Sequence, residues 1–205
     1  MTRRCVIAAL AASLGTISGC VPALEHLDSE LAGAASPVAT WADLRAWPLE
    51  IGAVVDGTLD VGAVPLDFPE GRSWCALYAV QPTTQPHSIV IRDDVYRGYA
   101  ARLVVEVLDA GRRRTRQLGW DDFHKPGLAG VHRLYITPRP GERYLLVHVD
   151  RAYDGEFAWM YTTMTAGHMS NGIYIPGYPM SHDVYWGPIG AYRIKVYREA
   201  TYGEP

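Results

Sequence analysis

Apolar and polar residues alternate in short runs along most of this chain. From Ile51 onward, runs rich in Val, Ile, Tyr and Leu are interrupted by Gly, Pro and Asp, and no helix-length periodic segment occurs. The regular spacing of strands and turn residues, without βαβ alternation, predicts an all-β fold, an antiparallel β-sandwich of the jelly-roll or immunoglobulin-like kind. The runs predicted as strands are Ala53–Val55 with Leu59–Val61, Trp74–Val80, Ser88–Asp93, Ala101–Leu108, Thr115–Gly119, Val131–Thr137, Arg143–Val149, Phe157–Thr165 and Ala191–Arg198.

Two pairs of these strands are predicted to form hairpins. Asp109-Ala110-Gly111 separates the strand ending at Leu108 from the one ending at Gly119, and its glycine suits a tight turn. Pro138-Arg139-Pro140-Gly141-Glu142 separates Val131–Thr137 from Arg143–Val149. Proline fixes φ and glycine supplies a positive φ, so we expect the second hairpin to be the firmer one.

The N-terminus has the layout of a secretory signal peptide. Arg3 and Arg4 precede an uncharged apolar run, Val6 to Ile17, which is shorter than the ~20 apolar residues that a membrane-spanning helix needs. Ile17-Ser18-Gly19-Cys20 resembles the bacterial lipobox, in which the cysteine thiol takes a diacylglycerol and becomes the new N-terminus. We therefore expect residues 1–19 to be a lipoprotein signal peptide and Cys20 to be lipidated. The alternative is an ordinary secretory signal in which Cys20 is incidental.

Residues 20–49 are expected to form a lipidated tether to a β-sandwich domain at 50–205. In this tether Leu24–Leu31 can form a helical turn before Ser36-Pro37, and Trp41, Leu44 and Trp47 are spaced for a short amphipathic turn that ends at Pro48. Because Val21 rather than Asp follows the cysteine, we expect the protein in the outer membrane of a Gram-negative cell, facing the periplasm. The partner at this end is the membrane, through the N-terminal lipid.

The charge of the chain argues against a nucleic-acid partner, and its cysteine content argues against an intramolecular disulfide. The whole chain has a net charge of −3, and loss of Arg3 and Arg4 leaves 17 basic against 22 acidic residues, or −5. No nucleic-acid partner is expected at that balance. Cys5 leaves with the signal and Cys20 carries lipid, so Cys75 is the one cysteine of the domain. An intramolecular disulfide is then impossible even in an oxidising compartment.

Several segments, taken in order, resemble the maltose operon periplasmic proteins of proteobacteria over about residues 50–198. They are Phe68-Pro69-Glu70-Gly71-Arg72-Ser73, Ser88-Ile89-Val90-Ile91, a long strand ending in Leu108-Asp109, Arg143-Tyr144-Leu145-Leu146-Val147, and Gly187-Pro188-Ile189-Gly190-Ala191-Tyr192-Arg193-Ile194-Lys195-Val196. The resemblance implies a non-enzymatic envelope protein with a β-sandwich that handles carbohydrate.

Aromatic residues crowd the last quarter of the chain. Gly172–Gly187 is punctuated by Pro176, Gly177 and Pro179, so we expect a long loop carried on the sandwich, a usual place for a binding site. Flat aromatic faces suit sugar C–H groups, and tyrosine hydroxyls reach sugar hydroxyls. The alternative is that the aromatic residues simply stabilise strands. The predicted carbohydrate site consists of Tyr174, Tyr178, Asp183, Tyr185 and Trp186, with Asn171 as a further polar contact.

Catalytic chemistry is not indicated. If the Pro138–Glu142 hairpin closes tightly, His132 lies near His148, with Asp150 two residues further on. Two histidines and a carboxylate on one face could bind zinc. The simpler interpretation is that both histidines are half-exposed strand residues. Ser181-His182-Asp183 cannot form a triad, because neighbours on an extended chain point to opposite sides. A glycosidase whose two carboxylates come from distant strands stays open as an alternative, although no pair is singled out. Without a catalytic constellation we expect no enzyme activity, no metal and no cofactor.

Two functions remain open. The first is a non-catalytic outer-membrane lipoprotein that binds carbohydrate through the C-terminal aromatic loop. The second is a structural or assembly lipoprotein that docks a protein partner in an envelope complex.

One basic cluster could contact anionic lipid A phosphates or another acidic envelope polymer, although charged residues are also common at exposed hairpin turns. It consists of Arg112, Arg113, Arg114 and Arg116.

Overall fold

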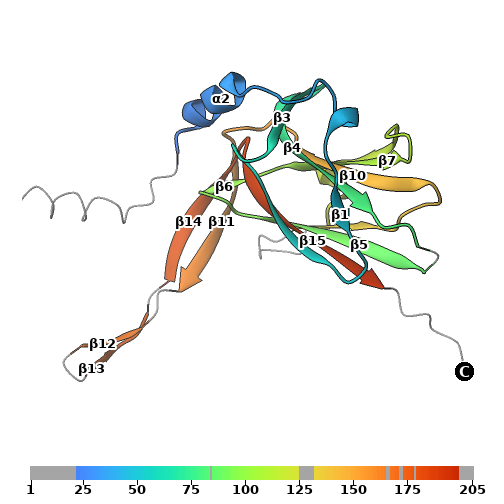
Figure 1. Cartoon of the computed structure of the whole chain (residues 1–205). Coiled ribbons are helices and arrows are strands. Elements are labelled where there is room, and N and C mark those ends of the chain that lie inside the picture. Colours follow the sequence, from blue (N-terminus) through green and yellow to red (C-terminus); the bar gives the residue numbers. More distant parts are fainter. Residues whose placement is uncertain are drawn as a thin grey trace, which may run out of the picture.

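The chain folds as an all-β sandwich, as the strand pattern predicts. The computed structural model describes residues 22–83, 85–124, 132–164, 167–170, 173–177 and 179–198. In these residues the strands form two facing sheets and a projecting arm, with a single α-helix, α2 (Leu24–Gly33), at one end (Figure 1). No helix among them is long and apolar enough to cross a bilayer.

The first sheet has the strand order β1-β4-β10-β7-β8, with β3 also paired to β4. All its neighbours are antiparallel except β1 and β4, which are parallel. The bounds are β1 (Trp47–Leu49), β3 (Val64–Phe68), β4 (Gly71–Val80), β7 (Leu103–Asp109), β8 (Arg114–Leu118) and β10 (Glu142–Val149). The strand pattern missed β3, because Pro65 interrupts the apolar run; proline is tolerated in strands at sheet edges.

The second sheet has the order β2-β15-β5-β9 and is antiparallel throughout. Its strands are β2 (Val54–Leu59), β5 (His87–Asp94), β9 (Arg133–Ile136) and β15 (Gly190–Arg198). Along β15, Tyr192, Ile194 and Val196 are buried, whereas Arg193 and Lys195 between them are partly exposed. This period of two turns one face of the sheet toward the core and leaves the other face to solvent.

The main core lies between the two sheets. Leu103, Val105 and Val107 of β7 pack in one cluster with Ile89 and Ile91 of β5. The Tyr78 and Tyr192 hydroxyls, one from each sheet, share a hydrogen bond of 2.7 Å inside it. A second, smaller cluster lies on the opposite face of the first sheet, and its buried members are Leu44, Leu66, Phe68, Cys75, Leu77, Leu108 and Leu146.

The segment expected to be a tether is packed against the sandwich. The predicted helical turn is a ten-residue helix, α2, and Leu27 and Leu31 of this helix are buried in the main core. Arg72 donates from Nε to the Leu31 carbonyl (3.1 Å) and from Nη2 to the Ala34 carbonyl (2.7 Å), and thereby fixes the end of the helix. Further along, Trp41–Asp43 is a short 3-10 helix and β1 adds a strand to the first sheet. The folded unit therefore includes residues before position 50.

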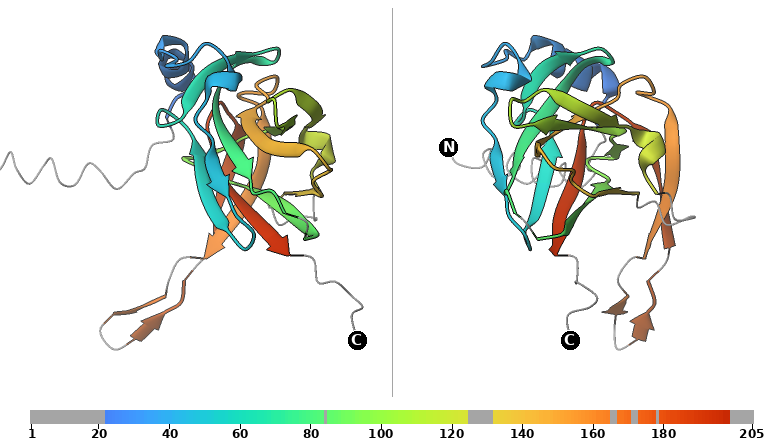
Figure 2. Two further views of the ribbon diagram at one scale, coloured as in Figure 1. Left: turned by 45° about the vertical axis from the view of Figure 1, so that its right-hand side comes forward. Right: turned by 90° about the vertical axis from the view of Figure 1, so that its right-hand side faces the viewer.

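A two-stranded arm projects from the sandwich. β11 (Phe157–Met164) pairs with β14 (Pro179–Trp186), and β6 (Tyr99–Ala100) pairs with the base of β14. β12 (His168–Ser170) and β13 (Ile173–Ile175) pair beyond it and form the tip, which points away from α2 (Figures 1 and 2). The prediction of a long loop over Gly172–Gly187 was therefore wrong, because cross-strand pairing of Pro179–Trp186 with β11 satisfies its backbone groups as a strand.

One predicted hairpin is confirmed and the other is wrong. β7 and β8 pair with Val105 opposite Leu118, on either side of the Asp109-Ala110-Gly111 turn. By contrast, β9 pairs with β5 in the second sheet, whereas β10 lies between β4 and β7 in the first. The Pro138–Glu142 segment therefore connects the two sheets. The turn residues alone do not reveal which partner each flanking strand pairs with.

Candidate functional site

The predicted carbohydrate-binding residues are spread along the arm. Tyr174 lies near the tip with 62% of its surface exposed, whereas Trp186 lies at the base and is buried. Asp183 and Tyr185 are exposed on β14 between these ends, where Tyr185 contacts Phe157 edge to face. Since β14 alone extends roughly 25 Å at ~3.3 Å per residue, the structure does not bring the Tyr174 and Trp186 rings together. Tyr178, Asn171 and Cys20, the residue predicted to be lipidated, lie outside the described residues.

The two histidines do not face each other, contrary to the hypothesis of a zinc site. His132 lies beside the second sheet, where its Nδ1 is 2.8 Å from Asp93 Oδ2 and its backbone N–H donates to Oδ1 (2.7 Å). Burial raises the pKa of Asp93 in spite of these hydrogen bonds. His148 is fully buried in the first sheet, with its ring stacked 3.8 Å from that of Phe68. Within the described ranges, no three His, Cys, Asp or Glu side chains are grouped to hold a metal.

The basic cluster of the β7–β8 hairpin is engaged within the protein. Arg112 donates to the carbonyls of Ala42 (2.6 Å) and Leu44 (2.7 Å), and so attaches the turn to the N-terminal segment. The other three arginines pair with acids: Arg113 with Asp109, Arg114 with Glu106, and Arg116 with Glu142. These bonds give the cluster a structural role that its sequence spacing does not show.

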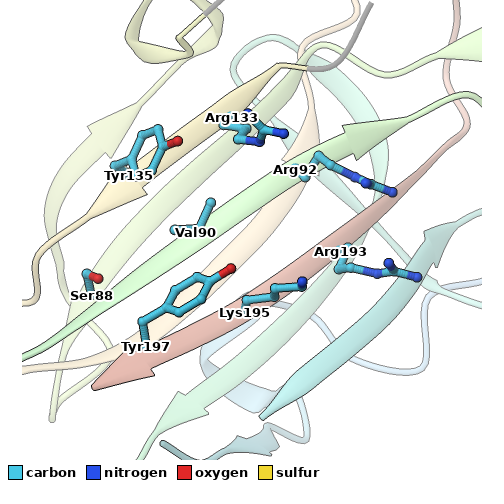
Figure 3. Close-up of a pocket in the computed structure, with 8 residues that line it drawn as sticks. All are labelled: Ser88, Val90, Arg92, Arg133, Tyr135, Arg193, Lys195 and Tyr197. Carbon is cyan, nitrogen blue, oxygen red and sulfur yellow. The ribbon is translucent and has the colours of Figure 1, made fainter. Parts of the chain in front are cut away.

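A different surface combines exposed rings with cations. It is the outer face of the second sheet, where residues at alternate positions of β5, β9 and β15 surround a hollow of about 400 Å³ (Figure 3). We call it the Arg/Tyr face, and it consists of Ser88, Val90, Arg92, Arg133, Tyr135, Arg193, Lys195 and Tyr197.

The strand register arranges the Arg/Tyr face in rows that run across the strands. Arg133, Arg92 and Arg193 are direct neighbours on β9, β5 and β15, in that order. The next row holds Tyr135, Val90 and Lys195, and Tyr197 follows opposite Ser88. Figure 3 shows the two tyrosine rings on either side of Val90, with the cationic side chains toward one end of the hollow.

The tyrosine rings of this face are accessible. Tyr135 and Tyr197 have exposed fractions of 59% and 47%. Ser88 adds a hydroxyl and Val90 an apolar floor between them, so that ring faces, an alkyl group and hydroxyls line one hollow. This combination suits a ligand with both C–H faces and hydroxyl groups.

The charges of this face are only partly balanced. Arg193 pairs with Asp56 (Nε to Oδ1, 2.5 Å) and Arg92 with Asp94 (Nη2 to Oδ2, 2.9 Å). The hydrogen bond and charge of Arg193 lower the pKa of Asp56, so this carboxylate stays ionised. Arg133 and Lys195 form no ion pair with any described residue. Four cations against two carboxylates leave a net charge of +2 here, although the chain as a whole carries −3.

Sequence reasoning missed this face, although each strand carries a signal of it. Ser88, Val90 and Arg92 are spaced by two, as are Arg193, Lys195 and Tyr197. Such spacing predicts a shared outward face within one strand. It does not show that β9, β5 and β15 are neighbours, and that adjacency creates the hollow.

Neither a scan against protein-family models nor a search of curated proteins finds a match to this chain. Its function must therefore be inferred from its own geometry.

Proposed function

We propose that this protein is a non-catalytic, lipid-anchored protein of the bacterial outer membrane that faces the periplasm and binds carbohydrate through the Arg/Tyr face. The observation that carries the proposal is the pair of exposed rings, Tyr135 and Tyr197, on either side of one hollow. Aromatic faces cover the C–H faces of sugars, and neighbouring polar groups bond their hydroxyls. Carbohydrate is the ligand class that the sequence also predicts, but the proposed site lies on the second sheet and not on the arm.

The N-terminal geometry fits attachment at Cys20. The Tyr99 hydroxyl donates to the carbonyl of Pro22 (2.8 Å), so contacts with the sandwich begin two residues after the cysteine. An acylated Cys20 would hold the α2 end of the sandwich close to the membrane surface. Diacylglycerol plus a further acyl chain anchors a protein stably, because more than one chain contributes. Mass spectrometry of the N-terminal peptide tests the modification, and Cys20→Ser should release the protein from the membrane fraction.

A glycan array on the secreted chain carrying Cys20→Ser tests the binding site. We expect bound glycans to be lost with Tyr135→Ala/Tyr197→Ala and kept with Tyr174→Ala, which removes an equally exposed ring from the arm. Loss of glycan binding with Tyr174→Ala alone would show that the binding site lies on the arm. A folded chain that binds nothing on the array would contradict carbohydrate binding.

The arm favours a second candidate function, the docking of a protein partner. Its exposed side chains are largely apolar, and such patches commonly mark interaction sites. They are Phe157, Met160, Met169, Ile173, Tyr174, Ile175, Met180 and Tyr185. Since the arm points away from α2, a membrane-anchored protein would extend it toward the periplasm (Figure 2). Photocrosslinking from position 173 in living cells tests this alternative, which predicts one dominant crosslinked protein.

A further inference from the structure

We propose that the ligand of the Arg/Tyr face is an acidic polysaccharide that lies across the strands. Its acid groups lie along the row formed by Arg133, Arg92 and Arg193, which we call the arginine row. This inference rests on the proposed carbohydrate function and specifies the ligand class. It is carried by the cations of the face, whereas the proposed function is carried by the rings.

The arginine row concentrates positive charge on three adjacent strands. Arg133 lies opposite Arg92, and Arg92 lies opposite Arg193. Neighbouring strands are about 4.8 Å apart, so the three residues span about 10 Å across the sheet. Like charges directly opposite each other destabilise a sheet. A row of three therefore needs anions, and Asp94 and Asp56 supply two of them at its Arg92 and Arg193 positions.

Several polar groups of the row are left for a ligand. Arg133 has no ion pair among the described residues, and neither has Lys195 one row away. Arg92 binds Asp94 through Nη2. Guanidinium groups bind carboxylates and phosphates through paired N–H donors. An anion on this row would thus satisfy donors that the protein itself does not.

The two kinds of side chain define the direction of the ligand. The arginine row and the row that contains Tyr135 and Lys195 run side by side across β9, β5 and β15. A chain laid across the strands would meet the three arginines along one edge and Tyr135, Val90 and Lys195 along the other, with Tyr197 in the row beyond. A polymer with repeated acid groups can use several cations at once, whereas a neutral polymer would leave them unpaired. The arrangement therefore favours an acidic sugar polymer over a neutral one.

Isothermal titration of the Cys20→Ser chain with polygalacturonate tests the inference, with fully methyl-esterified polygalacturonate as the neutral match. We expect the acidic polymer to bind at least about tenfold more tightly, and Arg133→Gln/Lys195→Gln to weaken it about tenfold or more. The charge-matched control is Arg45→Gln/Arg113→Gln, which removes two exposed cations elsewhere and should change the affinity less than twofold. Asp94→Asn should tighten binding, because it frees the Arg92 guanidinium.

Failure of this inference can be separated from failure of the proposed function. Equal binding of both polymers, abolished by Tyr135→Ala/Tyr197→Ala, would overturn the acidic ligand and leave carbohydrate binding standing. Inorganic polyphosphate serves as the charge-only probe. If it binds as tightly as polygalacturonate, and the tyrosine double variant affects neither, the face recognises charge without sugar and the inference is overturned. If neither sugar polymer binds and the glycan array is also silent, both proposals fail.

Discussion

Glu142 offers the sharpest test of what holds the two sheets in their observed arrangement. Its side chain is 4% exposed at the start of β10, where the connection from β9 enters the first sheet. Arg116 donates to it from Nε (2.9 Å to Oε1) and Nη2 (2.8 Å to Oε2). Thr115 Oγ1 adds a bond of 3.1 Å and the Arg139 backbone N–H one of 2.8 Å. One carboxylate thus ties β8, the inter-sheet connection and β10 together.

Glu142→Gln keeps the shape and removes the charge. An amide group presents N–H donors to Arg116, and the guanidinium, whose side chain is 20% exposed, loses its counterion. Removing one partner of a buried pair costs about 3–5 kcal/mol. Because Arg116 is partly exposed, we expect a cost of about 3 kcal/mol here. For a chain of this size that corresponds to a fall in Tm of about 6–12 °C.

The loss should depend on pH in a defined direction. Burial alone would raise the pKa of Glu142, but hydrogen bonds and charge from Arg116, with the Arg139 N–H and Thr115, lower it below its ordinary value. A lowered folded-state pKa stabilises the protein above the unfolded pKa of about 4.3, and this contribution is lost as the pH falls through the folded-state value. The difference between wild type and Glu142→Gln should therefore shrink below about pH 4.

Urea unfolding of both proteins at pH 7 and pH 3.5 measures the effect. Glu30→Gln is the control, because Glu30 belongs to an exposed pair with His26 and should cost less than about 0.5 kcal/mol. A double-mutant cycle with Arg116→Met isolates the coupling between the two side chains. A loss below about 1 kcal/mol for Glu142→Gln, or a loss that does not change with pH, would contradict a stabilising role of the Glu142–Arg116 pair.

Three further predictions concern the core. In Gly57→Ala the added Cβ would lie 2.5 Å from Cζ of the buried Tyr192 ring, so we expect a loss of about 1–3 kcal/mol in urea unfolding; an unchanged midpoint would show that the ring can move aside. Leu31→Ala should cost about 2–5 kcal/mol in the same assay, since α2 packs into the main core, whereas a loose tether would show no effect. Burial raises the pKa of the Cys75 thiol to about 12, so iodoacetamide at pH 8 should modify it only after denaturation, and rapid labelling of the native protein would contradict its burial.

The candidate site could be predicted only in part from the sequence. The sequence favoured an aromatic carbohydrate site in the last quarter of the chain, and Tyr197 of the Arg/Tyr face does lie there. Tyr135 and Arg133 come from a strand more than 50 residues earlier in the chain. They join Tyr197 because β5 pairs with β9 on one side and β15 on the other. Long-range pairing of this kind leaves no local trace in the sequence.

The all-β class, most of the strands and the β7–β8 hairpin could be predicted from the sequence alone. These features depend on alternation with a period of two and on turn residues, and both act between residues close in the chain. By contrast, three features depend on contacts between distant segments: β9 and β10 join different sheets, Pro179–Trp186 is a strand of an arm, and α2 packs into the core. The hydrophobic effect that drives this packing is non-directional, so it requires apolar faces to be covered without specifying which partner covers them.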